Sequence, residues 1–369
     1  MENRIVFGRW EAVTLLINMI CTKVFLNFPR SVAEVAGTAS WILVIYVSIL
    51  VFCLFFVISR LYKRFEGKDL LDIGEHVGGS FGRIVTGTVV LAFLMSFTSI
   101  ILREFAEDMK IIAFTLSPVS FVTMFFLICM AVGAYFGIEA IVRFHAIAVP
   151  VIAAGYLIIV IAVLPFTNFT NLLPILGTGP VDIFGKGIVR ISVFSEFLVL
   201  FLIVPFIRTD KNFKKIGFAS LGFSTFFLLT SASVYIAAIP YPTALESFLP
   251  IYQMARLINY GRFFQRVESL FMVVWATAAL LYLTASFYFV VYIFRKTFKL
   301  QYHRPLILPF AVIIFTLSLL PPNLVSAVEL ETTFLRRLSW IVTFAATILL
   351  LLIARAVKRK SKKEAKGCD

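Results

Sequence analysis

The sequence has little charge and few of the side chains that enzymes use for chemistry. Charged residues make up 15% of its 369 residues, and it contains only three histidines and four cysteines. Soluble domains carry about 25% charged residues, so this composition excludes an ordinary soluble enzyme, a disordered chain and a free-standing nucleic-acid binder. It also lacks a phosphate-binding loop, a zinc-ligand spacing and a serine–histidine–aspartate arrangement. We therefore expect no enzymatic activity, no metal, no cofactor and no nucleic-acid partner.

What the sequence has instead is long apolar runs. Hydrophobic residues make up 60% of the chain, including 41 phenylalanines. A bilayer span needs about 20 apolar residues, and helices satisfy their own backbone hydrogen bonds in lipid. These runs predict an all-α polytopic membrane protein with ten transmembrane helices, in a single membrane domain over 1–369. The expected helices are 10–29, 40–60, 84–109, 118–136, 143–165, 188–207, 216–238, 268–293, 305–322 and 336–355.

The basic residues predict the orientation in the membrane. The net charge is +14, from 34 Lys and Arg against 20 Asp and Glu. When the N-terminus and every second loop are placed inside, most of the basic residues fall on that side, as the positive-inside rule requires. We therefore expect both termini in the cytoplasm. The basic tail at 356–369 is interpreted as a topology anchor, with docking to anionic lipid as the alternative.

Two formally charged residues lie well inside the expected spans, Lys23 in the first and Glu196 in the sixth. A charge at mid-membrane costs about 3 kcal/mol on insertion scales, so such a residue is usually paired or functional. The first and sixth helices begin two five-helix halves, at 1–165 and 188–355, and each has a proline downstream, Pro29 or Pro205. Inverted five-plus-five repeats with interrupted first helices are typical of secondary transporters.

Two interpretations of this pair of charges stay open. Lys23 and Glu196 could line a central polar site that meets the carboxylate or amine of a zwitterion, with Glu196 able to bind a proton. Alternatively they form a structural ion pair, or face water in a vestibule separately. Four other charged residues end the expected third helix and are interpreted as a solvated cluster or a gate. They are Arg103, Glu104, Glu107 and Asp108.

Two segments are expected on the outer face. Residues 166–187 are rich in turn-forming residues. Residues 246–260 repeat apolar side chains at roughly helical spacing, which predicts a short amphipathic helix on that face, with a plain connecting loop as the alternative.

Several short strings, taken in order, resemble those of the B subunits of bacterial spore germination receptors. This family is a branch of the amino acid/polyamine/organocation superfamily of permease-like proteins. The strings are Phe-Pro-Arg at 28–30 with Ala-Glu-Val-Ala-Gly at 33–37, Asn-Leu-Leu-Pro at 171–174, Phe-Ser-Glu at 194–196, and Arg-Val-Glu-Ser at 266–269. The resemblance runs almost from end to end of the chain.

The resemblance implies a fold of the leucine-transporter type, with helices 1 and 6 interrupted. It also implies the sensing of a small-molecule germinant, often an amino acid, in the inner membrane of a dormant spore, together with A-type and C-type receptor subunits. In the family the pocket is built from helices 1, 3, 6 and 8. By position, it would be lined by Thr22, Lys23, Val24, Phe93, Phe97, Val193, Phe194, Glu196, Tyr282 and Ser286.

One departure from the family bears on the ligand. Family members often carry glycines in the break of helix 1, where backbone amides can receive a carboxylate. Here the matching stretch reads Cys21-Thr22-Lys23-Val24 and contains no glycine, so the backbone is less approachable. Lys23 could replace the amides, or it could fill the site. Three hypotheses therefore remain: a nutrient sensor, a proton-coupled amino-acid transporter, and a structural receptor subunit with a vestigial site.

Overall fold

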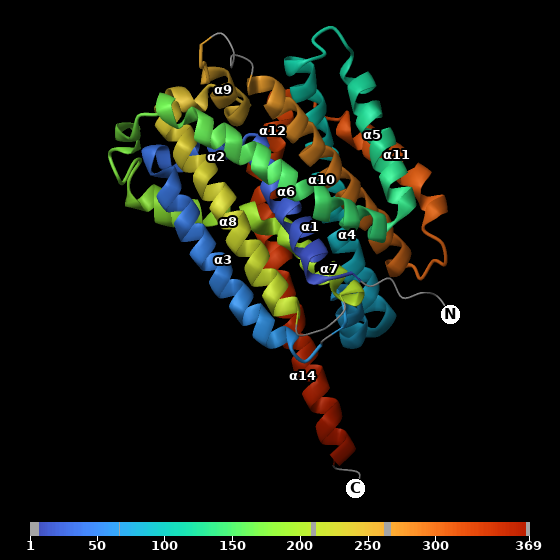
Figure 1. Cartoon of the computed structure of the whole chain (residues 1–369). Helices are drawn as coiled ribbons and strands as arrows, with labels where there is room; N and C mark the ends of the chain where they lie inside the picture. Colours follow the sequence, from blue (N-terminus) through green and yellow to red (C-terminus); the bar gives the residue numbers. More distant parts are fainter. Residues whose placement is uncertain (1–6, 66, 208–211, 262–266, 367–369) are drawn as a thin grey trace.

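The computed structural model describes residues 7–65, 67–207, 212–261 and 267–366, and these residues form a helical bundle (Figure 1). Within the described ranges the regular elements are helices, and one isolated parallel bridge joins Phe7 to Ile207. The main elements are α1 (Arg9–Cys21), η1 (Thr22–Phe25), α2 (Phe28–Ala36), α3 (Ser40–Tyr62), α4 (Leu70–Ile112), α5 (Val119–Phe136), α6 (Ile138–Val163), η5 (Val181–Gly185), η6 (Lys186–Leu198), α7 (Val199–Ile203), η7 (Val204–Phe206), α8 (Asn212–Ala238), α9 (Pro250–Leu257), α10 (Val267–Thr297), α11 (Arg304–Ser318), α12 (Leu324–Glu329), η9 (Leu330–Leu335), α13 (Arg336–Trp340), η10 (Ile341–Ala346) and α14 (Thr347–Lys366).

Eight helical stretches in the described part of the chain are long and apolar enough to cross a membrane. They coincide with eight of the ten expected spans. The other two expected spans correspond to shorter helices, since α1 has 13 residues and α11 has 15. The polytopic helical architecture is thus confirmed, while the count of ten stays a prediction.

The first helix is interrupted where the sequence predicts it. After α1 the chain tightens into the 3-10 turn η1, and Leu26 then leaves helical geometry with φ −97° and ψ −145°. Pro29 lies in the first turn of α2. Proline lacks an amide hydrogen and restricts the residue before it, so it starts a helix more easily than it continues one.

The sixth helix is irregular along most of its length. It begins with the π-helical turn η5, continues as the 3-10 segment η6, and regains α-helical geometry only in α7. Phe194 is non-helical, with φ −100° and ψ 16°. Pro205 lies in the closing 3-10 turn η7. Both predicted interruptions are therefore confirmed.

Two helices begin well before their expected bounds. The charged stretch 60–83 was expected to be a loop, but α4 begins at Leu70 and runs for 43 residues. Gly78 and Gly79 break its helical geometry, and Gly79 adopts φ 59°, which glycine tolerates best. The last span, expected from 336, begins at Leu324. On the outer face, α9 confirms the short helix predicted within 246–260.

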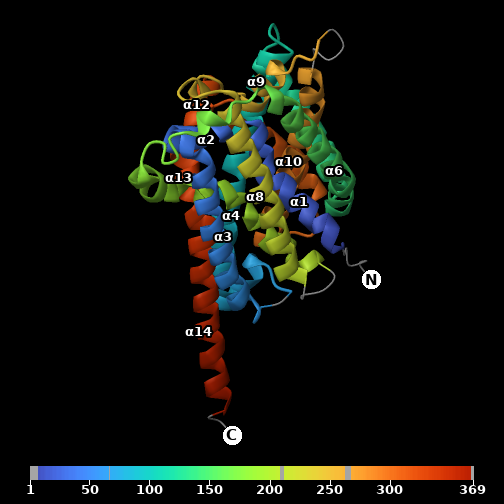
Figure 2. The same cartoon turned by 60° about the vertical axis from the view of Figure 1, so that its left-hand side comes forward.

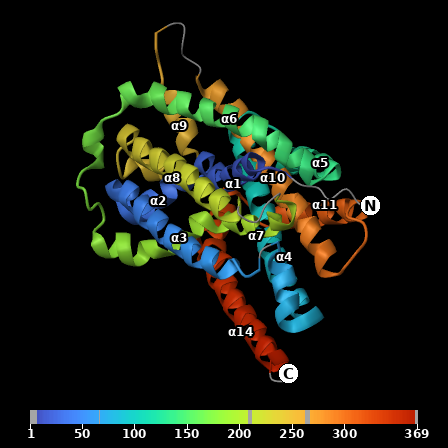
Figure 3. The same ribbon diagram turned by 60° about the horizontal axis from the view of Figure 1, so that its bottom comes forward.

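The two interrupted helices lie at the centre of the bundle. α1 packs against α6, α8, α10 and η6, and Figure 3 shows it between α8 and α10. α3 packs along α8, and α4 along α10. The beginning of α1 and the end of α14 point toward the same end of the molecule, where α14 extends beyond the rest of the bundle (Figures 1 and 2).

Candidate functional site

Lys23 and Glu196 meet across the two interrupted helices. The Lys23 ammonium in η1 forms an ion pair with the Glu196 carboxylate in η6 and also donates to the Val193 carbonyl at 2.6 Å. Lys23 is 4% exposed and Glu196 2%. The structure thus decides a question that the sequence left open, because the two charges pair directly instead of facing water separately.

The break in helix 6 frees backbone carbonyls, and side chains from other elements satisfy them. Besides the contact at Val193, Arg336 of α13 donates to the Ser192 carbonyl at 3.2 Å. Thr343 of η10 donates to the Ser195 carbonyl at 2.8 Å. Irregular backbone inside a membrane protein is tolerated where such partners replace the missing helical bonds. The last span therefore holds the break of helix 6 in place.

Arg336 belongs to the same charge network, although the sequence analysis did not single it out. Its guanidinium lies 3.8 Å from the second oxygen of Glu196 and forms an ion pair with Glu331 of η9. It also lies over the Phe97 ring, 5.6 Å from the centroid. Arg336 is 5% exposed. The positive charge of Arg336 is visible in the sequence beside the last apolar run. The last span was expected to begin at this residue, however, so the charge fell at the membrane edge.

The stretch of the last span around Arg336 is irregular. π-Helical turns lie on both sides of α13: Glu331 belongs to η9 and Thr343 to η10. π-Helical turns within α-helices occur frequently at functional sites. Here they carry two of the groups that join the last span to its surroundings, namely the carboxylate that pairs with Arg336 and the hydroxyl that binds the Ser195 carbonyl.

The charged residues at the end of the expected third helix are largely buried, so their interpretation as a solvated cluster is wrong. Glu104 is 1% and Asp108 2% exposed. Arg103 is also buried, and it pairs with the half-buried Glu107 at 2.8 Å. The last span and α11 pack against α4 and shield these side chains from solvent. The expectation that only two charges lie inside the spans is wrong for the same reason.

The residues expected from the third and eighth helices lie on two elements that pack together, α4 and α10. Phe93 and Phe97 are in ring contact at 4.8 Å. Ser286 of α10 bonds to Thr98 of α4 with 2.5 Å between their hydroxyl oxygens. Tyr282 is buried one turn earlier on α10. Of these residues, Phe97 is tied to the charge network through Arg336.

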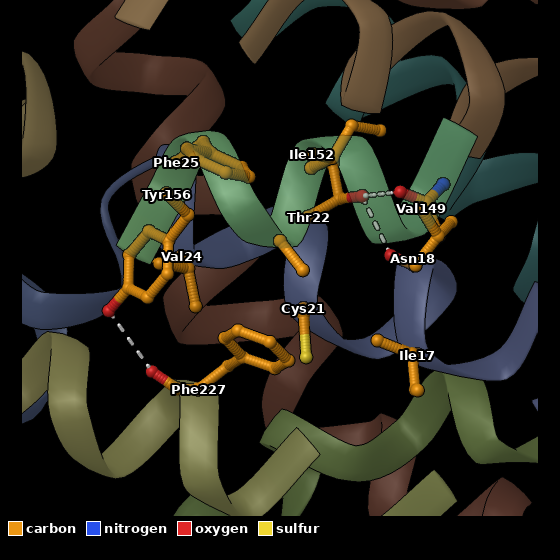
Figure 4. Close-up of a pocket in the computed structure, with 11 residues that line it drawn as sticks. Ile17, Asn18, Cys21, Thr22, Val24, Phe25, Val149, Ile152, Tyr156 and Phe227 are labelled. Atoms are coloured by element: carbon orange, nitrogen blue, oxygen red, sulfur yellow. Dashed lines mark hydrogen bonds between the residues drawn. The ribbon is translucent and has the colours of Figure 1, made fainter. Parts of the chain in front are cut away.

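Thr22 and Val24 belong to a different space from Lys23. They line a small cavity of about 30 Å³ between α1, η1, α6 and α8 (Figure 4). Neither Lys23 nor Glu196 lines this cavity. The Thr22 hydroxyl donates to the Asn18 carbonyl at 2.7 Å, and Tyr156 reaches the Phe227 carbonyl at 3.4 Å.

Val193 and Phe194 line a second small cavity, on the side of helix 6 that faces α2 and α3. The ten predicted pocket residues therefore do not surround one common space. In the described residues they divide between the charge network, the Phe93–Phe97 and Ser286 contacts, and these two cavities. As the structure stands, the site is closed around its own ion pairs.

A second charged cluster lies at the start of α4, and we call it the end cluster. It contains three acidic residues and three basic residues. They are Asp69, Asp72, Glu75, Arg83, Lys296 and Lys299. Asp69 precedes α4 and caps it reciprocally with Asp72. It also accepts from Lys296 at 2.5 Å and from the Tyr292 hydroxyl at 3.2 Å. Burial raises the pKa of Asp69 from 3.8 to about 6.

The fold places the chain in a known structural class. MhsT, solved in complex with L-phenylalanine, matches with a TM-score of 0.65 at 16% identity, over 93% of this chain and 87% of MhsT. Mhp1, a nucleobase-cation-symport-1 family transporter, matches with a TM-score of 0.65 at 13% identity, over 97% and 94% of the two chains. A Na⁺-coupled sialic acid symporter gives 0.64 at 13% identity, over 94% and 79%. The protein is an integral, multi-pass membrane protein with a leucine-transporter-type fold.

The family follows from the sequence comparison. The family model described as "Spore germination protein" matches residues 9–327, so the chain belongs to the spore germination protein family. Spore germination protein YndE of Bacillus subtilis (strain 168) is 22% identical over 357 residues, which cover 95% of this chain and 97% of YndE. Spore germination protein A2 of the same organism is 23% identical, over 85% and 86% of the two chains.

Proposed function

We propose that this protein is the nutrient-sensing subunit of a bacterial spore germination receptor. It binds a small germinant, an amino acid, between helices 1, 3, 6 and 8 and passes the signal to A-type and C-type partner subunits. It acts in the spore inner membrane, with both termini in the cytoplasm, and catalyses no reaction. Membership of the spore germination protein family supports this role, and the single structural observation that carries it is the ion pair between the breaks of helices 1 and 6.

The ion pair suggests how binding becomes a signal. Lys23 belongs to η1 and Glu196 to η6, so their contact holds two interrupted helices in one arrangement. A ligand with its own charged groups competes for these partners and favours a different arrangement. A signal requires different affinities for the two arrangements, since equal affinity shifts no equilibrium. Arg336 carries the shift to the last span, which contacts helix 6 at two carbonyls.

The test is a germination assay on spores of the host. Disruption of the gene should abolish the response to one nutrient among a panel of amino acids, sugars and nucleosides, and the wild-type gene should restore it. Glu196→Gln should abolish or shift that response at normal protein level, whereas Glu139→Gln, in an exposed pair with Arg143, should not. An unchanged concentration dependence in Glu196→Gln would exclude the proposed role of this carboxylate.

A second candidate function is proton-coupled transport of an amino acid, and the similarity of the fold to solved symporters favours it. Fold alone does not fix function. Purified protein in liposomes would then accumulate a labelled amino acid when a pH gradient is imposed. Binding without accumulation under that gradient would leave sensing as the function.

A further inference from the structure

Two acids of the charge network, Glu331 and Glu104, lie where the last span meets α4. Glu196 already has two cationic partners, Lys23 and Arg336. Glu331 shares Arg336, and Glu104 of α4 lies within electrostatic reach of both Glu331 and Arg336. The π-helical turn η9 and the short helix α12 before it pack directly against α4. Arg190 of η6 lies within the same electrostatic reach of Glu331 and Arg336. The charges here are therefore close to balanced, and what distinguishes the region is the hydrogen bonding of its oxygens.

Several oxygens in this region lack a hydrogen-bond donor. One oxygen of Glu104, one oxygen of Glu331 and the Ser192 hydroxyl are buried without a partner in the part of the chain that the structure describes. Arg336 donates to the other Glu331 oxygen and to the Ser192 carbonyl. Buried carboxylate oxygens without a donor are strongly unfavourable. These three oxygens are therefore open to a further donor.

We propose that Glu104 and Glu331 bind the primary ammonium group of the ligand, so that the site selects amine-bearing small molecules. An ammonium group carries one positive charge and three donors, as many donors as there are unpartnered oxygens on Glu104, Glu331 and Ser192. Arg336 lies beside it and can receive the carboxylate of an amino acid. This inference rests on the proposed function. It assigns the amine to Glu104 and Glu331 and not to Glu196, because Glu196 already pairs with Lys23 and Arg336.

The experiment uses the full chain, purified and reconstituted in lipid nanodiscs. Binding is measured by thermal stabilisation and by titration with each of the twenty protein amino acids, glucose and inosine. Each amino acid that binds is then compared with its methyl ester, which keeps the amine, and with the acid of the same side chain in which hydrogen replaces the amine. The ester should retain measurable affinity, and the amine-free acid should bind at least about tenfold more weakly, as expected for a lost charged hydrogen bond.

The variants locate the effect. Glu104→Gln should weaken amino-acid binding at least about tenfold and reduce the preference for the amine. Glu104→Asp, which keeps the charge, should retain part of the affinity and part of the preference for the amine. Glu107→Gln is the matched control, because Glu107 lies on the same helix and pairs with Arg103; it should bind as the wild type does. If Glu104→Gln does not fold, Glu331→Gln and the ligand series on the wild type still decide the proposal.

Four outcomes would overturn the proposal. Equal binding of the amine-free acids, glucose or inosine would leave a sensor without an ammonium site. Unchanged binding with raised thermal stability in Glu104→Gln would mean that a proton neutralises this carboxyl. Stabilisation by sodium or potassium chloride, but not choline chloride, that disappears in Glu104→Gln would assign the acids to a metal ion. Binding of no compound at all would refute the proposed function together with this site.

Discussion

Two charged clusters join α4 to other helices, and they solve the problem of buried charge differently. In the end cluster three acids meet three bases, and Asp69 is satisfied by a lysine, a tyrosine hydroxyl and a helix N-terminus. Around Arg336, Glu196 and Glu331 have cationic partners, but one oxygen of Glu104 and one of Glu331 have no donor among the described residues. A cluster whose groups are all satisfied holds helices together, whereas buried oxygens without a donor are open to a further group.

The largest expected effect is the loss of Arg336. Arg336→Met leaves Glu331 without its cation and Glu196 with Lys23 alone, and breaking a buried pair in this way costs about 3–5 kcal/mol. Arg83→Met in the end cluster should cost much less, because Glu75 keeps Lys299 at 2.9 Å. Chemical unfolding of both variants in the same detergent measures the difference. Equal losses would mean that the second partner of Glu75, Lys299, does not compensate for the lost arginine.

The second prediction concerns coupling between the interrupted helices. Lys23→Met and Glu196→Leu should each destabilise the protein by leaving a buried charge without its partner. The double variant should lose less than the sum of the two, with a coupling free energy of about 1–3 kcal/mol. A double-mutant cycle of unfolding free energies measures it. Strict additivity would show that the contact contributes nothing beyond its two separate side chains.

The third prediction is a pH dependence that comes from Asp69 of the end cluster. The folded protein holds the proton of Asp69 more tightly than the unfolded chain, since burial raises its pKa from 3.8 to about 6. The contribution of this group to stability is therefore greatest at low pH and is lost as the pH rises through about 6, by on the order of 2 kcal/mol.

Unfolding free energies between pH 4 and pH 8 test this dependence against two variants. Asp69→Asn should reduce the change in stability across that range, whereas Asp72→Asn, at a half-buried position in the same cluster, should keep most of it, because burial is the larger cause of the raised pKa of Asp69. Parallel curves for the wild type and Asp69→Asn would refute the assignment.

The smallest effect is expected at the kink of α4, between the acids of the end cluster and Arg83. Gly79→Ala forces a side chain onto φ 59° and should cost about 1 kcal/mol. Gly78→Ala is the control, because its φ is −131° and no atom lies within 4 Å of the added carbon in either case. Thermal unfolding of the two variants should therefore separate backbone strain from packing. A similar cost at both positions would point to loss of the kink itself.

The sequence predicted the two interrupted helices, because a proline and a mid-membrane charge mark each of them. It also predicted the outer helix α9 from apolar spacing. It did not predict the burial of Glu104 and Asp108, because apolar periodicity along α4 says nothing about which helix covers its end. Arg336 was missed for a related reason, since a charge at the expected start of a span is ordinarily solvated.

Composition and hydropathy by themselves determined that this chain is a helical membrane protein, because apolar runs of this length must satisfy their backbone inside lipid. The order of its motifs determined its family. Only the tertiary structure decided that Lys23 pairs with Glu196, that Arg336 joins the last span to both Glu196 and Glu331, and that Glu104 is left with an open oxygen. These contacts join residues far apart in the sequence, and a charge finds its partner through helix packing, which local sequence does not encode.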